Sequence, residues 1–126
     1  PNKAKKFTFT VDERVELIRR CVKRFENVEV DISDGLLVDY AKSRGACAII
    51  KGLRAVSDFD WEFQMALANK KLEPGIETMF MASSEKYTYL SSTVVKELGK
   101  YGADLSEFVP VEIMDDIKDK LKSSSV

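Results

Sequence analysis

Apolar residues near the start of the chain are spaced first as in a helix and then as in a strand. Thr10 and Glu13 have the spacing of a capping box, and apolar side chains recur on one helical face as far as Phe25. This pattern predicts a helix over residues 11–25. The next residues alternate apolar with acidic side chains, which predicts a half-exposed strand over residues 28–32.

The middle of the chain repeats this alternation of helix and strand. A short helix is predicted to stop at Gly45, because glycine tolerates the left-handed backbone that often ends a helix. The apolar run at residues 46–50 is typical of a parallel strand covered on both faces. A longer helix is then predicted from Ser57 to a point before Pro74, followed by a strand over residues 77–81.

The remaining residues complete the order of elements. A polar loop leads to a helix that begins near Ser91–Thr93, and a final amphipathic helix carries Ile113, Ile117 and Leu121. Strands that alternate with helices favour right-handed crossovers and a parallel sheet. We therefore predict one α/β domain over residues 1–126, with helices on both faces of a parallel sheet. Three strands are few for this plan, which indicates that a part is missing from the front.

Composition describes a globular chain without a strong attraction to polyanions. The 126 residues are 44% hydrophobic and 33% charged, with a net charge of −1. We therefore expect no nucleic-acid or membrane partner, and any anion has to be held by local charges. The two cysteines lack metal or redox spacing, and no apolar run approaches the ~20 residues of a membrane span, so we expect a cytoplasmic protein. The absence of histidine excludes Ser-His-Asp and Cys-His triads within these residues.

Two segments have residues suited to an anion beyond the carboxyl ends of the predicted strands, where ligands bind in open parallel sheets. Lys51-Gly52-Leu53-Arg54 places a glycine, which permits close backbone approach, between two cations. The same residues fit a turn glycine beside surface cations equally well. Ser91–Thr93 offers hydroxyls and exposed amides at a helix start, which favour phosphate. Hydroxyl residues also cap many helices that bind no ligand.

No metal site is predicted within these residues. Asp58, Asp60 and Glu62 are close in sequence, but alternate positions on a helix diverge, and acidic residues in a first turn simply favour the helix dipole.

Several stretches indicate a family when they are taken together. They are Ile50–Phe59 (IKGLRAVSDF), Glu62–Ala66 (EFQMA) and Tyr89–Glu97 (YLSSTVVKE), with Asp34–Tyr40 (DGLLVDY) and Phe108–Pro110 (FVP). In these stretches, and essentially from end to end, the chain resembles bacterial phosphopantetheine adenylyltransferases. The resemblance implies a Rossmann-like nucleotidyltransferase fold and a homohexamer. It also implies Mg²⁺-ATP and phosphopantetheine as substrates, with dephospho-coenzyme A and pyrophosphate as products in coenzyme A biosynthesis.

The resemblance assigns site residues position by position. Catalytic roles fall on Lys3 and Arg54, and the phosphopantetheine side takes Lys3, Leu37 and Lys51. The ATP-binding positions are Gly52, Leu53, Arg54, Glu62, Tyr87, Thr88, Tyr89, Leu90, Ser91, Ser92 and Thr93. The implied reaction is a direct in-line attack by the pantetheine phosphate on the α-phosphorus of ATP. Catalysis then comes from positioning and from neutralising charge on the transferring group.

The chain departs from the family pattern in three ways. Lys51 stands where an arginine is usual, and the opening loop is longer than usual, so that Lys5 and Lys6 are alternatives to Lys3. The family's first β-α-β unit, with its G-[ST]-F-D-P segment and H-x-G-H motif, is absent. We therefore expect residues 1–126 alone to be inactive in adenylyl transfer. Two other functions stay open: a non-catalytic nucleotide-binding or oligomerising module, and a sister adenylyl- or cytidylyltransferase.

Overall fold

The computed structural model describes residues 7–123, apart from the side chains of Val56, Ser57 and Ser123. The chain divides into two compact units, one formed by Ser33–Tyr89 and the other by Pro1–Ile32 together with Leu90–Val126.

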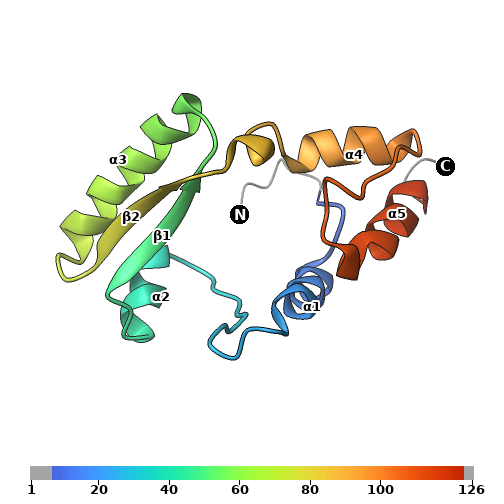
Figure 1. The fold of residues 1–126 in the computed structure, drawn as a ribbon. Coiled ribbons are helices and arrows are strands. Elements are labelled where there is room, and N and C mark those ends of the chain that lie inside the picture. The colour runs from blue at the N-terminus through green and yellow to red at the C-terminus, as the bar shows by residue number, and fades with distance from the viewer. Residues whose placement is uncertain (1–6, 124–126) are drawn as a thin grey trace. The chain divides into compact units, whose positions relative to one another are not determined.

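The unit Ser33–Tyr89 is a small α/β structure with a parallel sheet. Its elements are α2 (Leu37–Ser43), β1 (Ala48–Leu53), α3 (Val56–Leu72), β2 (Glu77–Ala82) and the short 3₁₀ helix η1 (Glu85–Tyr87). The two strands pair in parallel, in a register that runs from Ala48 opposite Glu77 to Leu53 opposite Ala82. In Figure 1, α3 lies along the two strands that it connects. The predicted α/β class and parallel sheet are confirmed.

The core of this unit lies where α2 meets the beginning of the sheet. Val38 and Ala41 on one face of α2 are buried against Ile49 of β1 and Ile76, which directly precedes β2. Gly45 has a φ of +66°, so the left-handed turn predicted after this helix is confirmed. The chain thereby reverses within a few residues and enters β1.

The two faces of the sheet differ in their surroundings. Phe80 contacts Phe59 of α3 edge to face, with ring centroids 5.8 Å apart, and Phe80 stands opposite Lys51 in the register. On the opposite face Ile50, Met79 and Met81 are 56–63% exposed. The run at residues 46–50 was predicted to be covered on both faces; within this unit only the face toward α3 is covered by the described residues.

Strand β1 also begins and ends later than the sequence predicts. It spans Ala48–Leu53 rather than residues 46–50, because its pairing with β2 continues through Gly52 opposite Met81 and Leu53 opposite Ala82. Three of the candidate anion-binding residues are therefore part of the strand, and only Arg54 follows it.

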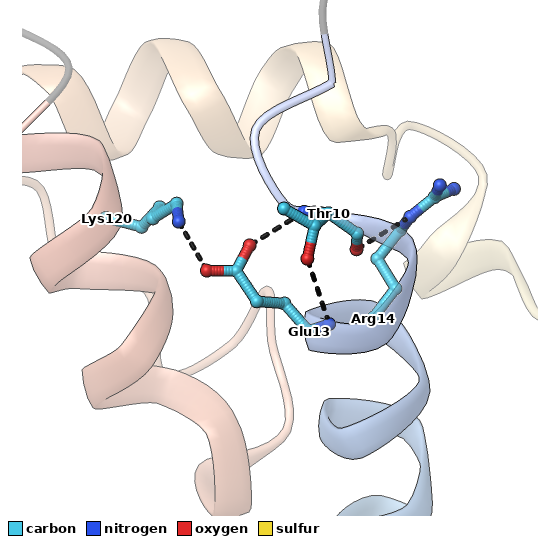
Figure 2. A network of polar contacts seen from close by, with 4 residues as sticks. All are labelled: Thr10, Glu13, Arg14 and Lys120. Carbon is cyan, nitrogen blue, oxygen red and sulfur yellow. Dashed lines mark hydrogen bonds and ion pairs between the residues drawn. The ribbon is translucent and has the colours of Figure 1, made fainter.

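The other unit is built from helices α1 (Val11–Val22), α4 (Ser92–Lys100), η2 (Val111–Ile113) and α5 (Met114–Ser123). The predicted capping box at the start of α1 is confirmed: the Glu13 amide donates to Thr10 Oγ1 at 3.2 Å, and the Thr10 amide donates to Glu13 Oε2 at 2.7 Å. Glu13 Oε1 also accepts from Lys120 Nζ of α5 at 2.5 Å, as Figure 2 shows. One carboxylate thus caps α1 and joins it to α5.

Close helix packing explains a glycine inside α4. Gly99 is buried in the helix, and an added Cβ there would overlap the side chain of Leu121 on α5. Leu121 and Leu105, the side chains that this Cβ would meet, are themselves 7% and 0% exposed. The absence of a side chain at Gly99 therefore lets α4 and α5 approach closely.

Two predictions about the segment after α1 are wrong. The helix ends at Val22 rather than at residue 25, where the Phe25 amide donates to the Val22 carbonyl in a turn. Residues 28–32 form no strand in the described structure, and the Ile32 amide donates to Asp31 Oδ1 at 2.8 Å instead. An alternating sequence becomes a strand only beside a partner strand, and here the two described strands pair with each other.

Candidate functional site

The carboxyl ends of β1 and β2 bring several predicted site residues to one edge of the sheet. Leu53 and Ala82 are opposite each other in the register, and the Ser83 amide continues the ladder by donating to the Leu53 carbonyl at 2.8 Å. Arg54 leaves this edge toward α3, and the loop that carries Tyr87 leaves it after β2. Ligands of open parallel sheets bind at this edge.

Gly52 has an unobstructed surface in this strand. Its backbone is extended, and it is not among the glycines of positive φ. A Cβ added at Gly52 would meet no atom within 4 Å among the described residues. The alternative that Gly52 is a turn glycine is therefore wrong, and the space beside its backbone is open to a ligand.

The side chain of Arg54 is held by the first turn of α3. Its Nε donates to Asp58 Oδ2 at 3.2 Å, and its Nη2 lies 3.4 Å from Asp58 Oδ1. The backbone amide of Arg54 donates to the same Asp58 Oδ2 at 3.3 Å. These bonds from Arg54 hold the pKa of the Asp58 carboxyl below its usual value, because they favour its ionised form.

Lys51 is paired in a similar way. Its Nζ lies 3.3 Å from Oε2 of Glu62, one turn further along α3 than Asp58. Both side chains are about one-third exposed, at 32% and 28%. The resemblance places Glu62 at ATP and Lys51 at phosphopantetheine, and the structure brings the two side chains into contact.

A shallow cavity of about 280 Å³ lies beside these pairs. It is lined by Gly52, Arg54, Asp58, Trp61 and Glu62, all from the end of β1 and the start of α3. Three of these were predicted site residues, whereas sequence reasoning gave no site role to Asp58. For Asp58 the sequence gave only its place in the first turn of the predicted helix, because Arg54 precedes that helix.

The loop after β2 exposes the predicted aromatic positions. Tyr87 ends η1 and is 43% exposed, and Tyr89 is 55% exposed. Lys86 Nζ stands 4.6 Å from the centre of the Tyr87 ring. Thr88 between the tyrosines is also exposed. These side chains are accessible to a ligand at the surface of this unit.

The helix start at Ser91 belongs to the other unit. Ser91 is the N-cap of α4, and its Oγ accepts from the Val94 amide at 3.3 Å, so the capping reading is confirmed. Ser92 and Thr93 are exposed in the first turn, and Leu90 is half-buried. Phosphate binding at this helix start, and its meeting with Arg54 at one nucleotide, stay predictions.

The other two residues assigned to phosphopantetheine are Leu37 and Lys3. Leu37 is the first residue of α2 and is 42% exposed. Lys3 lies outside the described residues. The structure therefore brings together Lys51, Arg54 and Glu62, while Leu37 lies at the start of a separate helix of the same unit.

The described residues show neither a metal-binding cluster nor a membrane-spanning helix. Residues 7–123 contain no group of three or more His, Cys, Asp or Glu side chains placed to hold a metal ion. In the same part of the chain, each helix is too short or too polar to span a membrane.

Comparison with known proteins identifies the family. Residues 1–98 match the cytidylyltransferase-like family model. The chain is 55% identical to phosphopantetheine adenylyltransferase of Caldanaerobacter subterraneus subsp. tengcongensis, over 98% of this chain and 77% of that protein. The enzymes of the same name from Finegoldia magna and Clostridium botulinum are 51% and 52% identical, over 94% and 95% of this chain and 74% and 73% of theirs. The chain therefore belongs to the cytidylyltransferase-like family and, within it, to the phosphopantetheine adenylyltransferases.

Proposed function

We propose that this chain acts in the transfer of an adenylyl group from ATP to phosphopantetheine, a step of coenzyme A biosynthesis that yields dephospho-coenzyme A and pyrophosphate. The similarity to three adenylyltransferases at 51–55% identity carries this proposal. The paired cations at the carboxyl end of β1 support it, because they lie at the edge of the sheet where nucleotides bind.

The reaction needs no covalent intermediate on the protein. An oxygen of the pantetheine phosphate forms a bond to the α-phosphorus of ATP while the bond from that phosphorus to the pyrophosphate oxygen breaks. The nucleophile is already ionised at neutral pH, so the protein contributes by aligning the two substrates and neutralising charge. Arg54 and Lys51 supply two of these charges, and Lys3 is proposed as a third.

The two cations have different substrates in this proposal. Arg54 contacts the phosphates of ATP, with Gly52 and Leu53 admitting the nucleotide against the strand. Lys51 contacts the phosphate of phosphopantetheine, and Leu37 packs against its apolar arm. The side chain of Arg54 is 43% exposed and that of Lys51 is 32% exposed, so both remain accessible while paired.

The remaining assignments concern the nucleotide. Glu62 contacts the ribose or its surroundings, and the segment from Tyr87 to Thr93 wraps the adenine and the phosphates. The exposed tyrosine rings support stacking on a base, and the amides of a capped helix start support phosphate binding.

Mg²⁺ is proposed to arrive with ATP. Mg²⁺ is commonly held by substrate phosphates, water and one or two carboxylates, and the two carboxylates that line the cavity, Asp58 and Glu62, are engaged in ion pairs. The residues therefore fit an ion that the nucleotide carries. When bound, it neutralises charge on the phosphates. A homohexamer in the cytoplasm completes the proposal and is supported by the family resemblance.

The experiment compares substrates and chain lengths. We use the term complete enzyme for a protein that carries these residues together with the histidine motif of the family. The complete enzyme is expected to form dephospho-coenzyme A from ATP and phosphopantetheine, detected by mass, and to use CTP poorly. Residues 1–126 alone are expected to bind nucleotide weakly without turnover. Preference for CTP supports a sister cytidylyltransferase, and nucleotide binding without turnover by the complete enzyme supports the non-catalytic module.

A further inference from the structure

The function of Asp58 is not explained by helix capping alone. α3 begins after Ala55, whose side chain makes no capping hydrogen bond. The Asp58 carboxylate accepts from the backbone amide of Ala55, the residue before the helix. It also accepts from the guanidinium and from the backbone amide of Arg54. Asp58 therefore binds Arg54 in addition to capping the helix start, and Arg54 lines the cavity at the end of β1.

We propose that Asp58 is a positioning residue that fixes the plane of the Arg54 guanidinium for the phosphates of ATP. This inference rests on the proposed function and adds a residue to it. An arginine side chain has several rotatable bonds, and Arg54 is 43% exposed, so hydrogen bonds to its head group matter for the orientation that it adopts. Contacts at both Nε and Nη2 set the guanidinium plane as well as its location.

The position of Asp58 is itself well determined. Its backbone amide donates to the Ala55 carbonyl at 3.1 Å in the first turn of α3, and its side chain is 28% exposed. The lowered pKa of the carboxyl is consistent with this arrangement, because hydrogen bonds from Arg54 favour the ionised form. Asp58, held in the first turn of α3, thus sets the position of the Arg54 guanidinium.

The test is a double-mutant cycle in the complete enzyme. Asp58→Asn keeps the size of the side chain but removes its charge and one acceptor oxygen. We expect it to lower kcat/KM for ATP about 10-fold, since a misplacement of about 1 Å can cost 10²-fold. In an Arg54→Ala background the same substitution is expected to change kcat/KM less than about 2-fold, because the residue that it positions is gone.

Controls separate positioning from structure. The KM for phosphopantetheine should stay constant, and Asp58→Glu should recover part of the loss. Asp60→Asn removes an exposed carboxylate from the same turn and should have no effect. An equal loss from Asp58→Asn in both backgrounds, or no loss in either, overturns the proposal.

Binding distinguishes failure of this inference from failure of the proposed function. If the unsubstituted complete enzyme forms no dephospho-coenzyme A, the proposed function fails. Calorimetric titration with ATP then decides the inference. Affinity weakened by Asp58→Asn only where Arg54 is present supports positioning, and affinity that is unaffected, or weakened equally in both backgrounds, overturns it.

Discussion

The starts of α1 and α3 share one local arrangement of side chains, which has a different role in each. In each, a carboxylate of the first turn accepts the backbone amide of a residue just before the helix and also binds a cation. At α1 the carboxylate is Glu13 and the cation is Lys120 of α5, whereas at α3 they are Asp58 and Arg54. The first arrangement joins two helices. The second holds a cation beside a cavity. The role of the arrangement therefore depends on the surroundings of the cation.

The largest expected effect concerns the α3 arrangement. Arg54→Ala in the complete enzyme should lower kcat/KM for ATP about 10²-fold, which is about 2.7 kcal/mol of transition-state stabilisation. Its melting temperature should change little, because the Arg54–Asp58 pair is exposed. Steady-state kinetics with ATP varied provides the measurement. Lys71→Ala, which removes an exposed cation near the end of α3, is the matched control; unchanged ATP kinetics in the Arg54 variant would refute the assignment.

A smaller and different effect is expected at the neighbouring cation. Lys51→Ala should raise the KM for phosphopantetheine about 10-fold while changing the KM for ATP little, because Lys51 is proposed to meet the acceptor phosphate. Varying each substrate separately at saturation of the other measures this. Lys51→Ala also leaves Glu62 without its ion-pair partner. Glu62→Gln, which removes the same ion pair through its other member, is therefore measured beside it. An equal effect of Lys51→Ala on both substrates would contradict the division of roles between Lys51 and Arg54.

The smallest effect concerns the α1 arrangement and pH. The hydrogen bond from Lys120, with that from the Thr10 amide, lowers the pKa of Glu13 below its ordinary value of 4.5. The folded state therefore binds fewer protons than the unfolded state just below pH 4.5, and the stabilisation is fully present above that pH and lost as pH falls further.

Urea unfolding measured from pH 7 to pH 3 tests this sign. Glu13→Gln should flatten the decline in the urea midpoint below pH 4.5 and leave the KM for ATP unchanged. A decline as steep as in the unsubstituted protein would show that other carboxylates control it. A change in the KM for ATP would contradict the distinction between the two helix starts.

Local patterns in the sequence predicted the elements that depend on neighbouring residues. The capping box of Thr10 and Glu13 and the left-handed turn at Gly45 are both confirmed, because each is determined within a few positions of the chain. The prediction of a strand over residues 28–32 is wrong, because an alternating sequence alone supplies no hydrogen-bonding partner. The end of β1 was also misplaced, because the register with β2 decides where pairing stops.

The residues of the candidate site could be predicted better than the contacts between them. The sequence resemblance named Lys51, Arg54 and Glu62, and the structure groups them beside the end of β1. The pairing of Lys51 with Glu62 depends on how α3 lies across the sheet, which no local pattern specifies. The contact of Arg54 with Asp58 was not specified either, because the helix dipole already explains an acidic residue in a first helical turn.

Adenylyl transfer by the complete enzyme is tested most directly by following the phosphates of ATP. With ATP labelled at the α-phosphorus and phosphopantetheine as acceptor, we expect the label in dephospho-coenzyme A. With ATP labelled at the γ-phosphorus, we expect it in pyrophosphate. Arg54→Ala should slow both transfers equally. Label from the γ-phosphorus in the pantetheine product, or α-label that stays in free AMP, would contradict in-line transfer of an adenylyl group to phosphopantetheine.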